Sequence, residues 1–317
     1  MIAYLTRRIL LAIPTVIGVC FISFALFYLV RSPESLARQN ISSKHPTPAQ
    51  IHGWIVQHGY DKPMGKQFET FMGQLLLFHF GSSDVDSEPI ADKIRSGFGP
   101  SLVLAVPEFL VGTWVTIALA LFVAYYRGTY VDTWGTFCFV LMMSISVLLY
   151  IIAGQYIFGK LLKLAPVMGF HWGLSTWKFI VLPATVGVLA GIGGSVRFYR
   201  TVMLEEMNQD YVRTARAKGA AESTILFRHI LKNSMIPILT AVAMAIPFLF
   251  TGSILMESFF GIPGLGNLTY TAVQSGDFAV IRVMVYIGSL LYILGTILTD
   301  ISYALADPRV RVGAAAQ

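Results

Sequence analysis

The feature that most constrains the fold of this chain is a series of six long apolar runs. A bilayer core about 30 Å thick is crossed by roughly 20 mainly apolar helical residues, and each run approaches or exceeds that length. The runs cover residues 9–30, 102–126, 134–158, 179–195, 235–255 and 280–304. Because lipid offers no partners for backbone hydrogen bonds, the runs predict an all-α membrane protein with six transmembrane helices.

Composition and the first run support this interpretation. Of the 317 residues, 55% are hydrophobic and 13% are charged, about half the charged share of an average soluble protein. Arg7 and Arg8 precede the first run as in a secretory signal, but the run is too long for a signal core and has no small-x-small cleavage site. It predicts an uncleaved span. Cys20 and Cys138 lie inside apolar runs, where small buried side chains are expected instead of a disulfide or a metal site.

The distribution of charge predicts an orientation. The segment 197–234 carries seven basic residues against four acidic ones, and short basic loops face the cytoplasm. With six spans, this orientation puts both termini inside and the loop 257–279, which has no basic residue, outside. The loop between the third and fourth runs, with Lys160, Lys163 and Lys178, argues the other way.

The polar stretch 31–100 predicts a small outer cap of short helices. Proline is favoured at the start of a helix and glycine just past its end. Pro48 with Gly59, and Pro63 with Gly81, therefore bracket two helices.

A third short helix is expected at 87–96. The chain has no internal repeat and no low-complexity tract, which predicts one transmembrane domain over residues 1–317.

Motifs for catalysis and nucleotide binding are missing from the sequence. No glycine-rich turn is followed by Lys and Ser or Thr, so any ATP that drives this protein must be bound by another chain. His-Glu-x-x-His and Gly-x-Ser-x-Gly are also missing, which predicts a protein without catalytic or metal-binding residues. Nucleic acid is excluded as a partner because the basic residues lie in separate loops and form no continuous stripe.

The segment 197–234 is the most informative part of the chain. Its alanines, basic residues and apolar spacing predict two short helices hinged at Gly219. A short rigid helix between two spans would transmit a partner's movement to those spans; a solvated basic loop that only sets topology is the alternative. The residues assigned to this coupling loop are Arg213, Thr214, Ala215, Arg216, Ala217, Lys218, Gly219, Ala220 and Ile230.

These residues carry a resemblance to a known family. The alanines before Gly219, and the apolar pair and Pro237 ahead of the next run, resemble the "EAA" loop of inner-membrane permeases of binding-protein-dependent ABC importers. The basic version found here is similar to the branch that imports dipeptides, oligopeptides and, in some members, nickel. Arg213 and Thr214 stand where the general motif has glutamate, as is usual in that branch. Further similar segments lie at 4–10, 59–63, 80–83, 257–266 and 307–311.

The resemblance implies the type I ABC importer permease fold in a bacterial inner membrane. It also implies a second homologous permease subunit, two cytoplasmic ATPase domains that bind ATP and Mg²⁺, and a solute-binding protein outside, with alternating access as the mechanism. No cofactor is expected in this chain. Nickel or a modified peptide remains an alternative substrate, and an ATP-independent channel or membrane receptor remains an alternative function.

The resemblance also places the loop 257–266 near the outer gate and the docked binding protein. The gate residues are Glu257, Pro263, Gly264 and Gly266. The glycines at 261–266 invite a phosphate-site hypothesis, but their outside position favours a tight turn. Glu257 is either a gate residue or a solvated helix end.

Polar residues in the middle of apolar runs are candidates for the translocation path. They are Ser144, Ser146, Tyr150, Gln155, Thr251 and Ser253, and hydrogen bonding between helices is the alternative role for each. The third run departs from the family because Val147 follows the Ser-Ile-Ser sequence where a proline is common after the Ser-Ile pair. Glu108 and Asp300 lie near predicted span ends, where snorkelling to the interface explains them.

Overall fold

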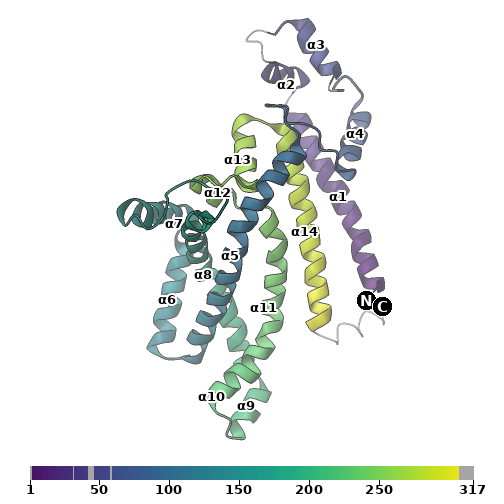
Figure 1. The fold of residues 1–317 in the computed structure, drawn as a ribbon. Coiled ribbons are helices and arrows are strands. Elements are labelled where there is room, and N and C mark those ends of the chain that lie inside the picture. The colour runs from purple at the N-terminus through teal and green to yellow at the C-terminus, as the bar shows by residue number, and fades with distance from the viewer. Residues whose placement is uncertain (1, 31, 42–45, 58, 307–317) are drawn as a thin grey trace. The chain divides into compact units, whose positions relative to one another are not determined.

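The computed structural model describes residues 2–30, 32–41, 46–57 and 59–306, and the regular structure in these residues is helical (Figure 1). The chain divides into two compact units. Unit 1 contains Phe98–Asn267 and the chain from Leu294 onward, and unit 2 contains Ile2–Gly97 with Leu268–Ile293. The single transmembrane domain stays a prediction. The segment 307–311 and the side chain of Asp300 lie outside the described residues.

The predicted apolar runs all lie on helices. Four helical stretches in the described chain are long and apolar enough to cross a membrane, namely Ile90–Tyr125, Thr176–Met207, Glu222–Phe250 and Phe278–Thr299. A bent pair, Tyr130–Ser144 with Val147–Leu161, makes a fifth if it is counted as one span. The first run lies in α1 (Ile2–Val30), in which Leu10–Ala25 is a shorter apolar helix. The protein is an all-α membrane protein.

Unit 1 is built around the long helices α5, α8 and α11. In chain order its elements are α5 (Ile90–Tyr125, from Phe98), α6 (Tyr130–Ser144), α7 (Val147–Gly154), the π-helix η1 (Gln155–Leu161), α8 (Thr176–Met207), α9 (Asp210–Ala217), α10 (Glu222–Thr224), the π-helix η2 (Ile225–Leu231), α11 (Lys232–Ala245), the 3₁₀-helix η3 (Ile246–Phe250), α12 (Ile254–Phe260) and the start of α13 (Leu265–Ser275).

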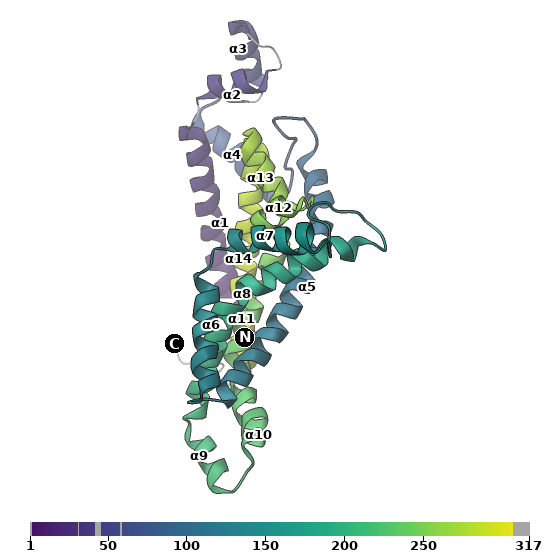
Figure 2. The ribbon, with the colours of Figure 1, turned by 90° about the vertical axis from the view of Figure 1, so that its left-hand side faces the viewer.

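The third apolar run does not form the continuous helix that was predicted. α6 ends at Ser144, and the axis turns by 91° before α7 and η1, which lie across it (Figure 2). Ile145 is extended at the bend, and the Tyr150 hydroxyl donates to the Met142 carbonyl at 2.9 Å, so one carbonyl freed at the end of α6 is satisfied. Hydropathy is continuous through the bend and therefore did not reveal it.

Three other boundaries differ from the predictions. The predicted cap helix at 87–96 is the beginning of α5, because Pro100 and Pro107 are accommodated inside one 36-residue helix. The fourth run continues as α8 to Met207, well past the predicted end at Ser195. The fifth run ends at Phe250, so Leu255 belongs to α12.

Buried apolar side chains hold unit 1 together in two clusters. One joins α5, α8, α9, η2 and α11 through Ala120, Ala124, Ile192, Val196, Tyr199, Met203, Val212, Ile225, Leu226, Ile230 and Ile238. The other joins α5, α7, α8 and α12 through Leu104, Ile151, Ile180, Leu182, Val186, Met256, Phe260 and Ile262. Gly193 of the fourth run allows α8 to pack closely on α6, because a Cβ at this position would lie 2.6 Å from the Phe139 carbonyl oxygen of α6.

Unit 2 contains two of the predicted cap helices together with parts of the chain from both of its ends. Its helices are α1, α2 (Pro33–Asn40), α3 (Pro48–Gln57), α4 (Met64–Leu76), the first turns of α5, most of α13, and α14 (Phe278–Ala306) as far as Ile293. α3 and α4 confirm the two proline-started helices, although α4 ends at Leu76, before Gly81. α1 packs on α4 through aromatic pairs such as Phe24 with Phe68, whose ring centroids lie 5.4 Å apart.

The two cysteines have different environments. Cys20 is buried in α1, as predicted, and Cys138 is exposed on α6, where the prediction of a buried side chain was wrong.

Candidate functional site

A cavity in unit 1 is bounded by α5, α8 and the end of the helix that contains α11. Its volume is about 330 Å³, and its lining includes Glu108, Thr113, Gly187, Ser195 and Ser253. A second hollow of about 540 Å³ lies along the same helices and shares Thr113 and Ser195 with the first. We call these two hollows together the α5–α8 cavity.

Glu108 is the one acidic side chain of the described residues that lines the α5–α8 cavity, and no basic side chain among them lines it. It stands 18 residues after Ile90, about 27 Å along the helix axis at 1.5 Å per residue. Among the described residues, no cation or hydrogen-bond donor pairs with its carboxylate. A Cβ at Gly187 would overlap this carboxylate, so glycine at 187 makes room for it. An unpaired carboxylate in a cavity suits a cationic ligand group.

Glu108 lines a cavity, a position that the sequence analysis did not assign to it, and snorkelling to the interface stays a prediction. The helix that contains Glu108 begins at Ile90, earlier than the apolar run that begins at Leu102. An ionisable residue inside an apolar run was the signal that could have identified it, because such residues usually face a protein interior or a water-filled cavity.

A second polar site in unit 1 surrounds Glu257, whose side chain is fully buried. The Ser101 hydroxyl donates to Oε1 at 2.7 Å, the Ser253 N–H donates to the same oxygen at 3.2 Å, and the Asn267 N–H donates to Oε2 at 3.0 Å. The Gly266 N–H also donates to this carboxylate. Burial raises the pKa of Glu257, and the donated hydrogen bonds oppose the rise. Glu257 with its donors is called the Glu257 cluster.

The glycine-rich turn wraps tightly around the Glu257 carboxylate. A Cβ at Gly264 would lie 2.5 Å from the Ser101 hydroxyl and closer still to the carboxylate, and Gly266 packs as closely on the Ser253 backbone. Pro263 is exposed on the outside of the turn. The predicted tight turn is confirmed, and the alternative of a solvated helix end at Glu257 is wrong.

Several of the predicted path residues donate hydrogen bonds to backbone carbonyls. The Ser144 hydroxyl donates to the Val140 carbonyl of α6, and the Thr251 hydroxyl donates to the Phe248 carbonyl of η3, at 2.8 Å each. Gln155 donates to the carbonyls of Val167 and Phe259, at 3.1 and 2.8 Å.

The remaining path candidates lie at helix starts and at the bend. Ser146 and Ser253 are the N-cap residues of α7 and α12, and Tyr150 spans the bend after α6. Of the six candidates, Ser253 lines the α5–α8 cavity.

The predicted coupling segment contains a short helix, α9, that projects beyond the ends of α8 and α11 with α10 beside it (Figure 1). Val212 is completely buried against η2 and anchors α9 in the first apolar cluster. Gly219 has φ +76°, and the Ala220 N–H donates to the Ala215 carbonyl at 3.2 Å, which is a Schellman ending. The predicted hinge glycine therefore lies just past the C-cap residue, Lys218, and ends α9.

The outer face of α9 is basic and exposed. It contains Thr214, Ala217 and Lys218 together with two arginines, Arg213 and Arg216. Arg216 makes two hydrogen bonds to the Glu222 carboxylate, at 2.7 and 3.0 Å, across the glycine turn.

The second predicted short helix is not separate. α10, η2, α11 and η3 follow one another as a single 29-residue helical stretch from Glu222 to Phe250. Ile230 is completely buried in the π-helical part of this stretch, so it anchors α9 from beneath and is not on the exposed face. Movement of α9 would therefore act directly on a membrane helix.

No metal site accompanies these features. Within the part of the chain that the structure describes, no three His, Cys, Asp or Glu side chains form a group that could hold a metal ion. The expectation that this chain binds no cofactor stays a prediction.

Comparison with known proteins identifies the family. Residues 116–312, more than half of the chain, match the binding-protein-dependent transport system inner membrane component. The chain belongs to this family. Residues 1–92 also match the N-terminal part of such membrane components.

Individual permease proteins are similar over almost their full lengths. The glutathione transport system permease protein GsiC of Salmonella typhimurium is 30% identical over 312 residues, which cover 98% of this chain and 99% of that protein. The oligopeptide transport system permease protein AppB of Bacillus subtilis is 29% identical over 326 residues, with 98% and 99% covered. A putative peptide permease of Brucella suis is 29% identical over 321 residues, with 98% and 100% covered. This chain is thus a multi-pass inner-membrane permease component of a binding-protein-dependent transport system.

Proposed function

We propose that this permease is one of two related permease subunits of an ATP-driven peptide importer. Separate ATPase subunits would supply ATP hydrolysis, and a solute-binding protein would deliver the peptide. The shared peptide and glutathione names of the relatives support a short peptide as the substrate. The family supports a binding protein as a partner.

The observation that carries this proposal is the construction of α9. Its basic face is exposed, whereas Val212 and Ile230 tie it to the helical stretch that begins at Glu222. A partner that binds the exposed face would therefore move a membrane helix directly, because the buried contacts join α9 to that helix. We infer that this face meets the ATPase and that α9 lies on the cytoplasmic side, in agreement with the excess of basic residues.

We infer that the α5–α8 cavity contributes to the translocation path. Its lining combines a carboxylate and hydroxyl groups with glycines that leave room between the helices. With Glu108 unpaired among the described residues, a peptide's terminal ammonium is the group that this cavity would accept. Closure of the ATPases would tilt the spans and open the path alternately to the two sides. The Glu257 cluster would then brace the turn at the outer end of unit 1.

The test is reconstitution. The permease is purified from its native membrane, its stoichiometric partners are identified, and ATP hydrolysis and peptide uptake are measured in proteoliposomes. The proposal expects a second permease, an ATPase and a binding protein whose peptide stimulates both activities. A stable assembly without an ATPase would refute it.

A Gly219→Leu variant tests the role of α9 within the same assembly. Leucine is strained at φ +76°, at a cost of about 1–2 kcal/mol, and should displace the end of α9 without unfolding the spans. ATP hydrolysis should continue while uptake falls at least tenfold. The matched control is Gly65→Ala, which replaces a glycine in open space and should leave both activities unchanged.

A further inference from the structure

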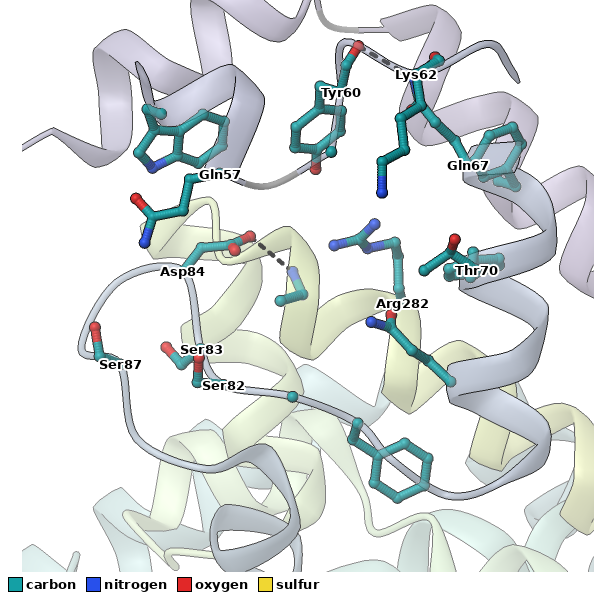
Figure 3. A pocket seen from close by; sticks show the side chains of 18 of the residues that line it. Gln57, Tyr60, Lys62, Gln67, Thr70, Ser82, Ser83, Asp84, Ser87 and Arg282 are labelled. Atoms are coloured by element: carbon teal, nitrogen blue, oxygen red, sulfur yellow. Dashed lines mark hydrogen bonds between the residues drawn. The ribbon is translucent and has the colours of Figure 1, made fainter. Parts of the chain in front are cut away.

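Unit 2 contains a pocket that the proposed function does not use. Its volume is about 700 Å³, and its walls are the turn after α3, one face of α4, the loop before α5 and the start of α14 (Figure 3). Small-molecule sites commonly occupy about 300–1,000 Å³, so the pocket is large enough for a short peptide.

Two cations project into this pocket from different walls. Figure 3 shows the Lys62 ammonium and the Arg282 guanidinium directed into the same space, Lys62 from the turn before α4 and Arg282 from α14. Within the described chain, neither forms a salt bridge. Arg282 uses its Nε to donate to the Phe278 carbonyl at 3.2 Å, and its guanidinium lies over the ring of Phe71, with its central carbon 5.8 Å from the ring centroid. Its terminal amino groups remain directed at the pocket.

The wall that carries Lys62 is held in place by α4. The Gln67 side-chain amide donates to the carbonyls of Tyr60 and Lys62, at 3.1 and 2.7 Å. The ring of Tyr60 also stacks on Trp54 of α3, with centroids 5.7 Å apart. These contacts hold the base of the lysine side chain, so the ammonium is presented from a fixed backbone.

The opposite wall is fastened to the start of α14. Asp277, which is buried, accepts from the Ser83 hydroxyl and from the Asp84 N–H, the latter at 3.2 Å. In return, Asp84 accepts from the Ala279 N–H at 3.0 Å. This reciprocal pairing fixes the loop before α5 one turn from Arg282. Hydroxyl groups of Ser82, Ser83, Ser87 and Thr70 complete a polar lining.

We propose that this pocket binds the carboxylate of a short peptide through Lys62 and Arg282. A guanidinium offers paired N–H donors that match a carboxylate, and the lysine adds a second positive charge to the same anion. The remaining hydroxyl and amide groups would bind peptide backbone, which explains a pocket larger than one carboxylate requires. The choice of a peptide over another carboxylate rests on the proposed function.

The experiment measures ligand binding to the full chain in lipid nanodiscs at low ionic strength. The probes are dialanine and its C-terminal amide, and their binding is measured by calorimetry or ligand-observed magnetic resonance. Dialanine should bind at least tenfold more tightly than the amide. Lys62→Gln and Arg282→Gln should each weaken dialanine binding at least tenfold, and Lys66→Gln, which removes a nearby exposed lysine outside the pocket, should leave it within twofold.

Several results would overturn this proposal. Equal binding of dialanine and the amide would show that the carboxylate is not recognised, and an equal loss in Lys62→Gln and Lys66→Gln would show a general charge effect. Displacement by inorganic phosphate at equal or lower concentration, lost in the same variants, would assign the pocket to phosphate groups instead. Lys62 lies in an exposed turn, so its variant remains informative even if Arg282→Gln misfolds.

Failure of this proposal is distinguishable from failure of the importer proposal. Dialanine binding is measured on this chain alone and needs no ATPase or binding protein. If the assembled importer takes up peptide but Lys62→Gln does not change dialanine binding, only the pocket proposal fails. If dialanine binding depends on Lys62 but the chain copurifies with no ATPase, the pocket proposal stands and the importer proposal fails.

Discussion

Replacing Glu257 by glutamine should destabilise unit 1 although the two side chains have nearly the same shape. The carboxylate accepts hydrogen bonds at both oxygens, from Ser101 and Ser253 at Oε1 and from Asn267 at Oε2. A glutamine amide accepts at one atom only, so its NH₂ group must face at least one donor. Because the substitution leaves no cavity, the change in stability reports the altered hydrogen bonds alone.

The magnitude follows from the buried donors. A buried donor without a partner costs about 1–3 kcal/mol, and loss of the charge weakens the hydrogen bonds that remain by about 1 kcal/mol. Glu257→Gln should therefore lower the free energy of unfolding by about 2–4 kcal/mol. The assay is unfolding of the purified chain by sodium dodecyl sulfate in mixed micelles, followed by circular dichroism.

The matched control is Glu205→Gln, an identical change on the exposed surface of α8. Surface substitutions usually change stability by less than about 0.5 kcal/mol. If both variants unfold alike, the buried hydrogen bonds around Glu257 do not stabilise the protein and the argument fails. A double variant with Ser101→Ala should also lose less than the sum of the two single losses, because both changes disrupt the same hydrogen bond.

Three further predictions concern unit 1. Gly264→Val should cost about 1–3 kcal/mol in the same unfolding assay because its side chain overlaps the buried carboxylate; an unchanged midpoint would contradict the observed packing. Glu108→Gln should lower uptake of a dipeptide with a free amino terminus about tenfold and have little effect on its N-acetylated form, so equal effects on both would remove Glu108 from ammonium binding. Asp132→Asn should cost roughly 1–3 kcal/mol because it removes the negative charge that pairs with Arg200, whose Nε donates to the Asp132 carboxylate at 2.9 Å; a loss that Arg200→Gln does not reproduce would point to another cause.

Several features of the fold and site were predictable because they depend on local composition. Apolar length identified the segments that became helices, and the proline and glycine pairs identified α3 and α4. The end of a short helix at Gly219 was predictable because this position takes a positive φ, which glycine adopts more readily than other residues do. Each of these signals lies within about one element of the chain, so it needs no information from distant residues.

Other features depended on contacts between distant residues. The helix break at Ile145 is not marked by a proline or a charged residue in the sequence. It is supported by the hydrogen bond from the Tyr150 hydroxyl to the carbonyl eight residues earlier. Glu108 became a cavity residue because Gly187, far along the chain, leaves space for its carboxylate.

The sequence by itself determined an all-helical membrane chain, since apolar runs of this length have no other stable arrangement in lipid. Only the tertiary structure decided which polar groups share a site. Ser101 lies 156 residues before Glu257, and Ser83 lies 194 residues before Asp277, so the helices had to pack before either pair could form. Helix formation responds to neighbours along the chain, whereas the enclosure of a carboxylate responds to neighbours in space.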